Sequence, residues 1–394
     1  MGVRRPHPRE VGPLTGLLPS GGTVAAGFEP VRDAFENNFA EHGEIGASAC
    51  VSVEGRVVVD IWGGWSRPDH SAPWEADTLV NAFSVGKGLT AIVAAMLVDS
   101  AALSYGMKVS SVWPEFRGGG KEDLTLAALL GHRAGLPAVR ETLPPLSMYD
   151  WELMCTSLAR TDPWWRPGSA HGYHVNTFGF LVGEVIRRAT GRSVGQLFGE
   201  FFRLGLGADV HLGLPDAEHH RVAEFEWPPG GITQPTDTGA FDRDQLLAFN
   251  TYNNPIGTSG GGTVNTPEWR RAEIPSTNTH ATARGVERVY RELAAAGGSL
   301  LSEAGVRNAV AEVSNGHDEV LGRNSRFGMG LQIPIPERGF GPNNEAFGHY
   351  GAGGSMGFCD PVAGVAFGYV MNQMGPRWQN PRNRALIDAL YSCL

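Results

Sequence analysis

Ser84 and Lys87 stand three residues apart in residues 81–93, which read NAFSVGKGLTAIV. The spacing predicts a helix that begins at Ser84 and ends near Ser100, with both side chains on one face. A serine at a helix N-terminus, beside an amine that can lose its proton, is a way to make a nucleophile. The S-x-x-K pattern also arises by chance about once in a chain of this size, so the pair needs further support. One buried helical face is formed by apolar residues, which are Leu89, Ile92, Val93, Met96 and Leu97.

Lysine is scarce in this chain, which makes its presence at position 87 informative. The sequence contains only Lys87, Lys108 and Lys121, and its other basic residues are arginine and histidine. Arginine keeps its proton at accessible pH, whereas a desolvated lysine can release it. A lysine on a buried face of an arginine-rich chain therefore indicates proton transfer.

Tyr173 is a second candidate, in residues 171–179 (HGYHVNTFG), after the Pro167-Gly168 break and before an apolar helix. A tyrosine held on such a loop can act as a base if nearby cations favour its phenolate. The ordinary alternative is that this side chain packs in the core.

A third candidate is the glycine-dense segment 347–354 (FGHYGAGG) near the C-terminus. Dense glycine in a strand marks a place where a ligand or another backbone comes close. An edge strand of this kind can offer a backbone N–H to a developing oxyanion. His349 in this segment is either a site residue or a packing histidine.

Two G-x-S-x-G sequences, at 257–261 and 353–357, match the nucleophile elbow of α/β-hydrolases. That elbow requires a strand, a sharp turn and then a helix. Ser355 is followed by another predicted strand and Ser259 by more glycine, and the alternation of parallel strands with helices is missing. We therefore do not expect the α/β-hydrolase fold.

The elements that must position these candidates come from both ends of the chain. Strands at the two ends with helices between them predict an α+β core completed by both termini. The expected strands are 47–53 and 57–62, joined by a Glu54-Gly55 turn, then 327–335, 346–357 and 364–372, with a turn at 360–364. The expected helices are 28–39, 84–100, 124–130, 146–159, 178–189, 194–204, 282–295 and 384–393.

Bulk properties exclude several classes of function. The chain has 394 residues, 42% of them hydrophobic, which is enough for one large domain or two interleaved ones. A net charge of −9 without a basic run argues against nucleic acid as the main partner. The sequence contains no stretch of about 18 apolar residues, so we expect no membrane span. The basic start is not followed by the apolar segment that a signal peptide requires.

Cysteine and histidine spacing predicts neither disulfides nor a metal site. The four cysteines are scattered, and the adjacent pair His219-His220 fits a surface feature better than a shared ion. We therefore expect a reduced, cytoplasmic enzyme without metal or cofactor.

The order of Ser84-x-x-Lys87, Tyr173 and a His-x-Gly strand resembles the serine β-lactamase and penicillin-binding-protein superfamily. More closely it resembles the class C β-lactamase-like esterases, the family VIII carboxylesterases. Residues 129–137 (LLGHRAGLP) resemble that group's L-L-x-H-x-x-G-L-P segment, and residues 165–168 (WRPG) precede the tyrosine loop. The resemblance covers nearly everything from about residue 28 onward.

The resemblance implies a β-lactamase/transpeptidase-like fold, with an antiparallel sheet flanked by helices and a second, mainly helical sub-domain. We expect a flexible tail at 1–25, an α/β sub-domain from 26–104 and 282–394, and the helical sub-domain at 105–281. The active site would then lie in the cleft between the two sub-domains.

The resemblance also assigns roles. Ser84 would be the nucleophile that forms an acyl-enzyme, and Lys87 would help to remove its proton. By its charge Lys87 would lower the pKa of Tyr173, which would act as general base in acylation and later activate the incoming water, alcohol or amine. The backbone N–H groups of Ser84 and Ala352 would form the oxyanion hole. Which of Lys87 and Tyr173 takes the proton stays open, because the pair titrates as a unit.

Two departures from the β-lactamase pattern favour an esterase. The K-T-G strand motif reads His349-Tyr350-Gly351, so the lysine that meets a β-lactam carboxylate is replaced. The Y-x-N motif would need Asn at 175, where Val175 stands, and Asn176 comes one place late. The expected substrate-binding residues are His349, Tyr350, Gly351, Asn176, Trp165 and Trp378.

We therefore predict a serine hydrolase that cleaves small-molecule carboxylic esters. One alternative is an acyltransferase that passes the Ser84-bound acyl group to an amine or alcohol. Less favoured alternatives are a β-lactamase or peptidase and a non-catalytic binding protein on the same scaffold.

Overall fold

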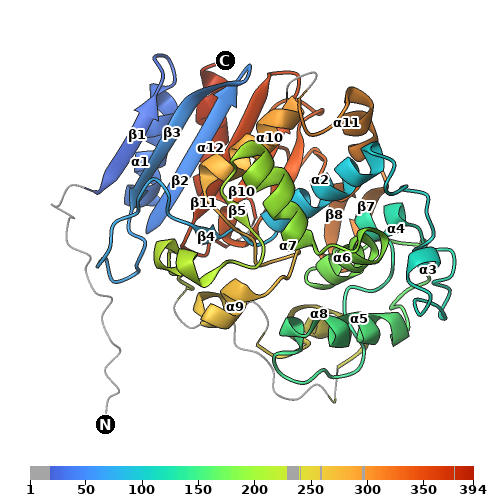
Figure 1. Ribbon diagram of the computed structural model, residues 1–394. Coiled ribbons are helices and arrows are strands. Elements are labelled where there is room, and N and C mark those ends of the chain that lie inside the picture. Colours follow the sequence, from blue (N-terminus) through green and yellow to red (C-terminus); the bar gives the residue numbers. More distant parts are fainter. Residues whose placement is uncertain (1–17, 229–238, 240, 258–259, 295–297, 377) are drawn as a thin grey trace, which may run out of the picture.

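The computed structural model describes residues 18–228, 239, 241–257, 260–294, 298–376 and 378–394 (Figure 1). In this part of the chain a six-stranded antiparallel sheet has the order β1-β3-β2-β11-β10-β9. Strands from the two ends of the chain are neighbours, because β2 pairs with β11 from Ala47–Met371 to Val53–Val365. The strands are β1 (Ser20–Val24), β2 (Gly46–Val53), β3 (Arg56–Gly64), β9 (Phe347–Tyr350), β10 (Met356–Asp360) and β11 (Val365–Met371). The α+β prediction and the hairpin at 46–64 are confirmed.

The two faces of the sheet are covered by different helices. On β11, the space where Gly368 would carry a Cβ is filled by the Ala283 carbonyl, 2.2 Å away, at the start of α10 (Ala283–Ala294). The next residue, Tyr369, donates a hydrogen bond to Glu44, which pairs with Arg382 in α12 (Pro381–Ser392). Successive strand residues point to opposite faces, so α10 and α12 cover opposite sides. Helix α1 (Glu29–Glu41) packs beside α12.

The expected N-terminal tail is too long. Residues 20–24 form β1, which pairs with β3 from Ser20–Gly63 to Val24–Val59. This strand lies at the edge of the sheet and includes Gly21 and Gly22, residues that are poor strand formers on their own. Pairing with β3 therefore orders a segment that composition alone marks as a tail. Residues 1–17 lie outside the described part of the chain.

Two strand predictions near the C-terminus are wrong. The single strand expected at 346–357 is divided into β9 and β10, which pair with each other antiparallel. The turn between them needs Gly353 (φ 82°) and Gly354 (φ 120°) in conformations that other residues avoid. The strand expected at 327–335 lies earlier, as β8 (Arg323–Phe327), which pairs with β7 (Ser314–Asp318).

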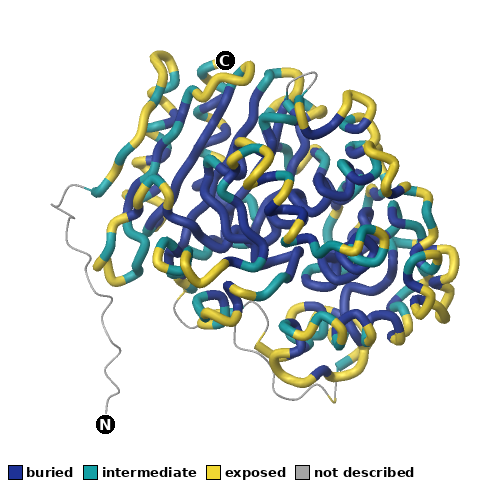
Figure 2. Tube along the Cα trace, viewed as in Figure 1, coloured by how far each residue is buried: buried dark blue, intermediate teal, exposed yellow. Residues whose placement is uncertain are grey.

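Helix α2 (Val85–Asp99) runs through the centre of the molecule, as predicted. Twelve of its residues are buried, and Figure 2 shows the buried backbone continuing from the central strands into this region. Two short strands lead into it: β4 (Val80–Asn81) pairs with β6 (His280–Ala281), which also pairs with β5 (Val210–His211). Residues near 280 are thereby brought beside the start of α2.

The middle of the chain is mainly helical. The helices are α3 (Val109–Val112), α4 (Leu126–Leu130), α5 (Trp151–Arg160), α6 (Thr177–Thr190), α7 (Val194–Leu197), α8 (Arg243–Asn253) and α9 (Pro267–Arg271), with a π-helical segment at Phe198–Leu204 and α11 (Glu303–Ala309) further on. Helix α8 was not expected. The sub-domain boundaries at 104/105 and 281/282 stay predictions. Among the described residues, no helix is long and apolar enough to cross a membrane.

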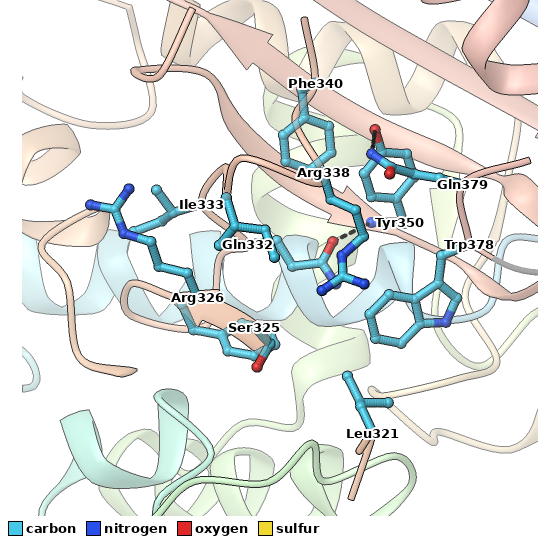
Figure 3. A pocket seen from close by; sticks show the side chains of 12 residues that line it. Leu321, Ser325, Arg326, Gln332, Ile333, Arg338, Phe340, Tyr350, Trp378 and Gln379 are labelled. Carbon is cyan, nitrogen blue, oxygen red and sulfur yellow. Dashed lines mark hydrogen bonds between the residues drawn. The ribbon is translucent and has the colours of Figure 1, made fainter. Parts of the chain in front are cut away.

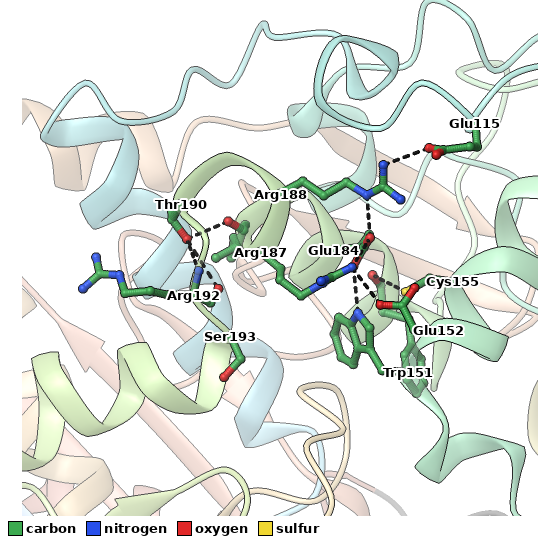
Figure 4. A network of polar contacts seen from close by, with 12 residues as sticks. Glu115, Trp151, Glu152, Cys155, Glu184, Arg187, Arg188, Thr190, Arg192 and Ser193 are labelled. Atoms are coloured by element: carbon green, nitrogen blue, oxygen red, sulfur yellow. Dashed lines mark hydrogen bonds and ion pairs between the residues drawn. The ribbon is translucent and has the colours of Figure 1, made fainter.

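A buried carboxylate joins the helices of this region (Figure 4). The Glu184 side chain on α6 is 0% exposed. It accepts hydrogen bonds from Trp151 Nε1 at 2.7 Å, from Arg187 Nε at 2.8 Å and from Arg188 Nε at 2.5 Å. Because these donors satisfy the charge, the pKa of Glu184 lies below its usual value even though burial alone would raise it.

Glu184→Ala should therefore lower the free energy of unfolding by about 2–4 kcal/mol, since it leaves the buried indole N–H and two arginines without their acceptor. Urea unfolding measures the loss. Glu152→Ala is the matched control, because Glu152 pairs with Arg187 but its side chain is 71% exposed, and it should cost less than about 1 kcal/mol. Equal losses in the two variants would contradict the assigned role of Glu184.

Candidate active site

Ser84 precedes the first turn of α2, directly after the short strand β4. Ala82 N donates to the Thr279 carbonyl at 2.8 Å, which ties this entry to the 275–279 segment. Phe83 has a φ of 48°, in the left-handed region that side chains disfavour. Its ring is held edge-on against Phe225 at 4.9 Å. The packing of Phe83, the residue before Ser84, therefore fixes the turn that presents Ser84. Ser84 itself is 7% exposed.

Lys87 is fully buried one turn further along α2, and its amine has three polar neighbours. Nζ donates to the carbonyls of Val175 at 2.6 Å and Ser276 at 2.8 Å, and it lies 3.1 Å from Ser84 Oγ. Burial lowers the pKa of Lys87 well below its usual value, because no carboxylate compensates the desolvation of the ammonium. A neutral amine has two N–H groups and one lone pair. An ammonium would donate to all three oxygens, whereas a neutral amine would donate to the two carbonyls and accept from the Ser84 hydroxyl.

Tyr173 lies over Lys87 with its ring centroid 4.8 Å from Nζ, and 1% of the residue is exposed. Burial raises its pKa well above the usual value, and the Ser84 hydroxyl opposes part of that rise. Tyr173 Oη has no well-formed hydrogen bond within the described part of the chain. The resemblance implied a lowered pKa for this tyrosine, and that direction is wrong. The reason is that the site desolvates both groups, so neutral lysine and neutral tyrosine are favoured together.

Two histidines and an aspartate hold the Tyr173 loop. His132 accepts from Gly172 N through its carbonyl and from His174 N through Nδ1, both at 3.1 Å. Asp318 Oδ1 accepts from Tyr173 N at 3.0 Å. Burial lowers the pKa of His132 well below its usual value and that of His174 to about 3, so both rings are neutral at physiological pH. Tyr173 is thus fixed by backbone bonds on either side.

The turn between β9 and β10 is docked on the entry to α2. Ser355 Oγ donates to the Ala82 carbonyl at 2.9 Å. A Cβ on Gly351 would lie 2.4 Å from the same carbonyl oxygen, so only glycine fits there. Among the backbone hydrogen bonds of the described residues, neither Ser84 N nor Ala352 N is a donor. That these two N–H groups form an oxyanion hole stays a prediction. Ser355 serves as a structural anchor, and Ser259 lies outside the described residues.

The same turn is held from behind by the start of α12. The Gly353 carbonyl accepts from Asn380 Nδ2 at 2.9 Å and from Arg382 Nη2 at 3.2 Å. Arg382 is fixed in turn by Glu44 at 2.7 Å, and both side chains are at most 4% exposed. The hydrogen bonds to the Gly353 carbonyl therefore fix the turn directly after Ala352.

His349 and Trp378 lie beside Tyr173, whereas their predicted contact with substrate stays a prediction. The Trp378 ring meets Tyr173 edge-on with 4.8 Å between centroids, and His349 lies 6.1 Å from Tyr173. His349 Nδ1 donates to the Tyr350 carbonyl at 2.7 Å, and its buried Nε2 has no partner among the described residues. Burial lowers the pKa of His349 to about 3, so Nε2 offers a lone pair.

Tyr350, Asn176 and Trp165 bond to the protein itself. Tyr350 Oη donates to the Gly339 carbonyl at 2.9 Å. Asn176 Nδ2 points to the Thr251 carbonyl at 3.4 Å, although its buried Oδ1 has no partner in the described residues. Trp165 Nε1 donates to the Ala170 carbonyl at 3.2 Å, and its ring packs on His174, behind the Tyr173 loop. A substrate contact for these residues stays a prediction.

Several residues of the site carry no signal in the sequence. Val175 and Ser276 act on Lys87 through carbonyl oxygens, which every residue type supplies. Asp318 and Arg382 lie far from the motifs in sequence and meet them only in the fold. His132 lies in the 129–137 segment that resembles the family's L-L-x-H-x-x-G-L-P sequence. That resemblance was the one signal that could have indicated a role for His132 in the site. In the described part of the chain, no group of three or more His, Cys, Asp or Glu residues could hold a metal ion.

Comparison with known proteins agrees with this geometry. The Beta-lactamase family model matches residues 31–391. The Esterase/beta-lactamase LipL of Mycobacterium tuberculosis (strain ATCC 25618 / H37Rv) is 32% identical over 354 residues, which is 88% of this chain and 81% of that protein. A crystal structure of a family VIII carboxylesterase superimposes with a TM-score of 0.87 at 39% identity, covering 95% of this chain and 100% of the other. A penicillin-binding protein homologue from Caulobacter crescentus gives 0.86 at 39% identity with the same coverage.

Proposed function

The chain belongs to the beta-lactamase family, and from this premise we propose that it is a carboxylesterase that works through an acyl-enzyme on Ser84. The observation that carries the proposal is the set of neighbours of Lys87 Nζ. Two carbonyls hold its N–H groups, and Ser84 Oγ lies 3.1 Å away on the remaining side. This arrangement supports the proposal, because a neutral amine held in it can take the proton of the serine hydroxyl as general base.

In acylation, Lys87 takes the Ser84 proton as Oγ bonds to the ester carbonyl carbon. The carbonyl oxygen becomes an oxyanion, which accepts hydrogen bonds from Ser84 N–H and Ala352 N–H. The carbon–oxygen bond to the alcohol then breaks. Tyr173, kept protonated by burial, donates its proton to the leaving alkoxide and regains one from the Lys87 ammonium.

Deacylation runs the same groups in reverse. Water takes the place of the alcohol and gives its proton to the neutral Lys87 and Tyr173 pair as it attacks the acyl carbon. The new tetrahedral oxyanion accepts hydrogen bonds from the same two N–H groups. The bond from the acyl carbon to Ser84 Oγ breaks, Oγ recovers a proton from Lys87, and the carboxylic acid leaves.

The residues at the mouth of the site support esters over β-lactams. Lysine is absent from β9, which carries His349 and Tyr350, and from position 351, where Gly351 follows the strand. A neutral His349 presents a lone pair, which would accept a hydrogen bond from an N–H or O–H group but would repel a carboxylate. The LipL relative is described as both an esterase and a β-lactamase, and we assign ester hydrolysis as the main activity.

The proposal is tested by quenching the enzyme during turnover of 4-nitrophenyl butyrate and mapping its peptides by mass spectrometry. We expect a butyryl group on Ser84 and none on the neighbouring buried Ser355. Adding a primary amine or alcohol separates hydrolysis from acyl transfer. Butyrate should remain the main product, and an excess of butyramide or butyl ester would instead establish the acyltransferase alternative. Turnover without a butyryl group on Ser84 would contradict the proposal.

A further inference from the structure

The Gly353 carbonyl, in the turn between β9 and β10, accepts three hydrogen bonds from outside the turn. The donors are Asn380 Nδ2 at 2.9 Å, Arg382 Nη2 at 3.2 Å and Gly375 N at 3.2 Å. The packing around this carbonyl is close, since a Cβ on Gly375 would lie 2.5 Å from its oxygen and 2.6 Å from Arg382 Nη2. The Gly353 carbonyl is therefore held in one direction.

This direction is passed on to the N–H group of Ala352. A planar trans peptide points its C=O and its N–H in opposite directions. The held Gly353 carbonyl therefore fixes the N–H of Gly354, which donates to the Gly351 carbonyl at 3.3 Å. The Gly351 carbonyl belongs to the same peptide as the Ala352 N–H, so this N–H points away from Gly354. Two peptides thus connect α12 to the orientation of one N–H group.

The turn depends on these outside contacts because it contains two adjacent glycines. Gly353 and Gly354 have φ values of 82° and 120°. Glycine adopts many other backbone conformations at little cost. Rotation of the peptide between these two glycines would break the hydrogen bond to the Gly351 carbonyl and release the Ala352 N–H.

Arg382 is the charged member of the contacts, and its side chain is fixed on all sides. Nη1 donates to Glu44 Oε1 at 2.7 Å, and Nη2 also donates to the Gln373 carbonyl at 2.9 Å. Glu44 accepts a further hydrogen bond from Tyr369 on β11. Desolvation offsets much of the stability that a buried ion pair provides, whereas the planar guanidinium holds a carboxylate and two carbonyls at once.

The segment that leads into α12 is anchored to the strand that leads into the turn. Gln379 Nε2 donates to Tyr350 Oη on β9 at 2.9 Å (Figure 3). Both side chains also donate to the Gly339 carbonyl, at 2.8 and 2.9 Å. The start of α12 and the turn therefore form one braced unit.

We propose that Arg382, held by Glu44, is a positioning residue that keeps the Ala352 N–H directed toward the oxyanion formed on the substrate. The inference rests on the proposed esterase function and adds to its site a buried ion pair between α12 and the segment before β2. The contribution of this pair arises only when charge develops on the carbonyl oxygen. It should therefore act on kcat and hardly on KM.

The test compares 4-nitrophenyl butyrate with the matched thionoester, in which sulfur replaces the carbonyl oxygen, in Arg382→Lys. Lysine keeps a charge beside Glu44 but has no planar fork for the carbonyls. Sulfur accepts hydrogen bonds more weakly than oxygen, so the oxygen ester depends more on a well-directed N–H. We expect kcat for the ester to fall about tenfold or more, with KM changed less than about twofold. The ester-to-thionoester ratio of kcat/KM should fall severalfold.

Asn380→Asp is a second variant that protects the test against misfolding. It keeps the oxygen that accepts from Arg382 N at 3.1 Å and caps α12, but it loses the amide donor to the Gly353 carbonyl. The same ratio should fall. Arg284→Lys is the matched control, because Arg284 pairs with Asp60 at 2.7 Å from α10, and it should leave the ratio at the wild-type value.

A lowered ratio in Arg382→Lys and Asn380→Asp, with the wild-type ratio in Arg284→Lys, supports the positioning role. If Arg382→Lys does not fold, Asn380→Asp decides alone. If the folded variants keep the wild-type ratio, because ester and thionoester turnover fall equally or not at all, the positioning role is wrong while the esterase function stands. If the wild-type enzyme turns over neither substrate and forms no butyryl group on Ser84, the proposed function fails and overturns this inference with it.

Discussion

Ser84→Ala is expected to lower kcat for 4-nitrophenyl butyrate by roughly 10⁴-fold or more, because the nucleophile and the acyl-enzyme disappear together. The alanine variant should fold as the wild type does. Ser84 is an N-terminal residue of α2 whose side chain makes no capping hydrogen bond. Its hydroxyl lies 3.1 Å from Lys87 Nζ.

The measurement is the initial rate of 4-nitrophenolate release with purified variants, with thermal unfolding as the check on folding. Ser355→Ala is the control serine. It removes the bond to the Ala82 carbonyl and should retain some hydrolysis and acylation of Ser84. Full activity in Ser84→Ala would contradict the account, and so would complete loss in Ser355→Ala alone.

Lys87→Arg should lower kcat/KM by about 10²–10⁴-fold, since general base catalysis is lost while a positive charge is kept. Lys87→Met should be as inactive but more stable, because it removes a buried amine that desolvation disfavours. If charge were the main contribution of Lys87, the arginine variant would retain much more activity than the methionine variant. Steady-state kinetics on the two variants distinguishes these cases.

The pH dependence of stability follows from the same lowered pKa. Between the pKa of folded Lys87 and its ordinary value near 10.5, the unfolded chain binds a proton that the folded chain does not. Stability therefore rises with pH across this window. The advantage of Lys87→Met over the wild type in urea unfolding should accordingly shrink as the pH is raised toward 10.5.

Much of the fold was predictable because it is encoded locally. The hairpin at 46–64 has alternating strands around a Glu54-Gly55 turn, and α2 has an uninterrupted apolar face. The prediction of one strand at 346–357 was wrong because Gly353 and Gly354 adopt positive φ values, which permit a turn between two strands. Glycine's tolerance of those values indicates only that a turn is allowed there. Strand β8 was misplaced because its polar residues are held by pairing with β7.

The proposed catalytic residues were predictable from motifs, whereas their protonation states were not. The type and spacing of Ser84 and Lys87 marked them, and the resemblance added Tyr173. The direction of the Tyr173 pKa depends on how completely the site excludes water, which is a property of the packed structure. The carbonyls of Val175 and Ser276 likewise meet Lys87 only in the folded structure.

The most direct test of a neutral Lys87 is an NMR titration of its side chain, since the chain contains only three lysines. Lysine labelled with ¹³C at the ε position should give signals assignable with Lys108→Arg and Lys121→Arg. The Lys87 signal should titrate well below 10.5, whereas the exposed Lys108, paired with Asp123 at 2.7 Å, should titrate above 10.5. A Lys87 signal that stays protonated up to or beyond 10.5 would contradict the account.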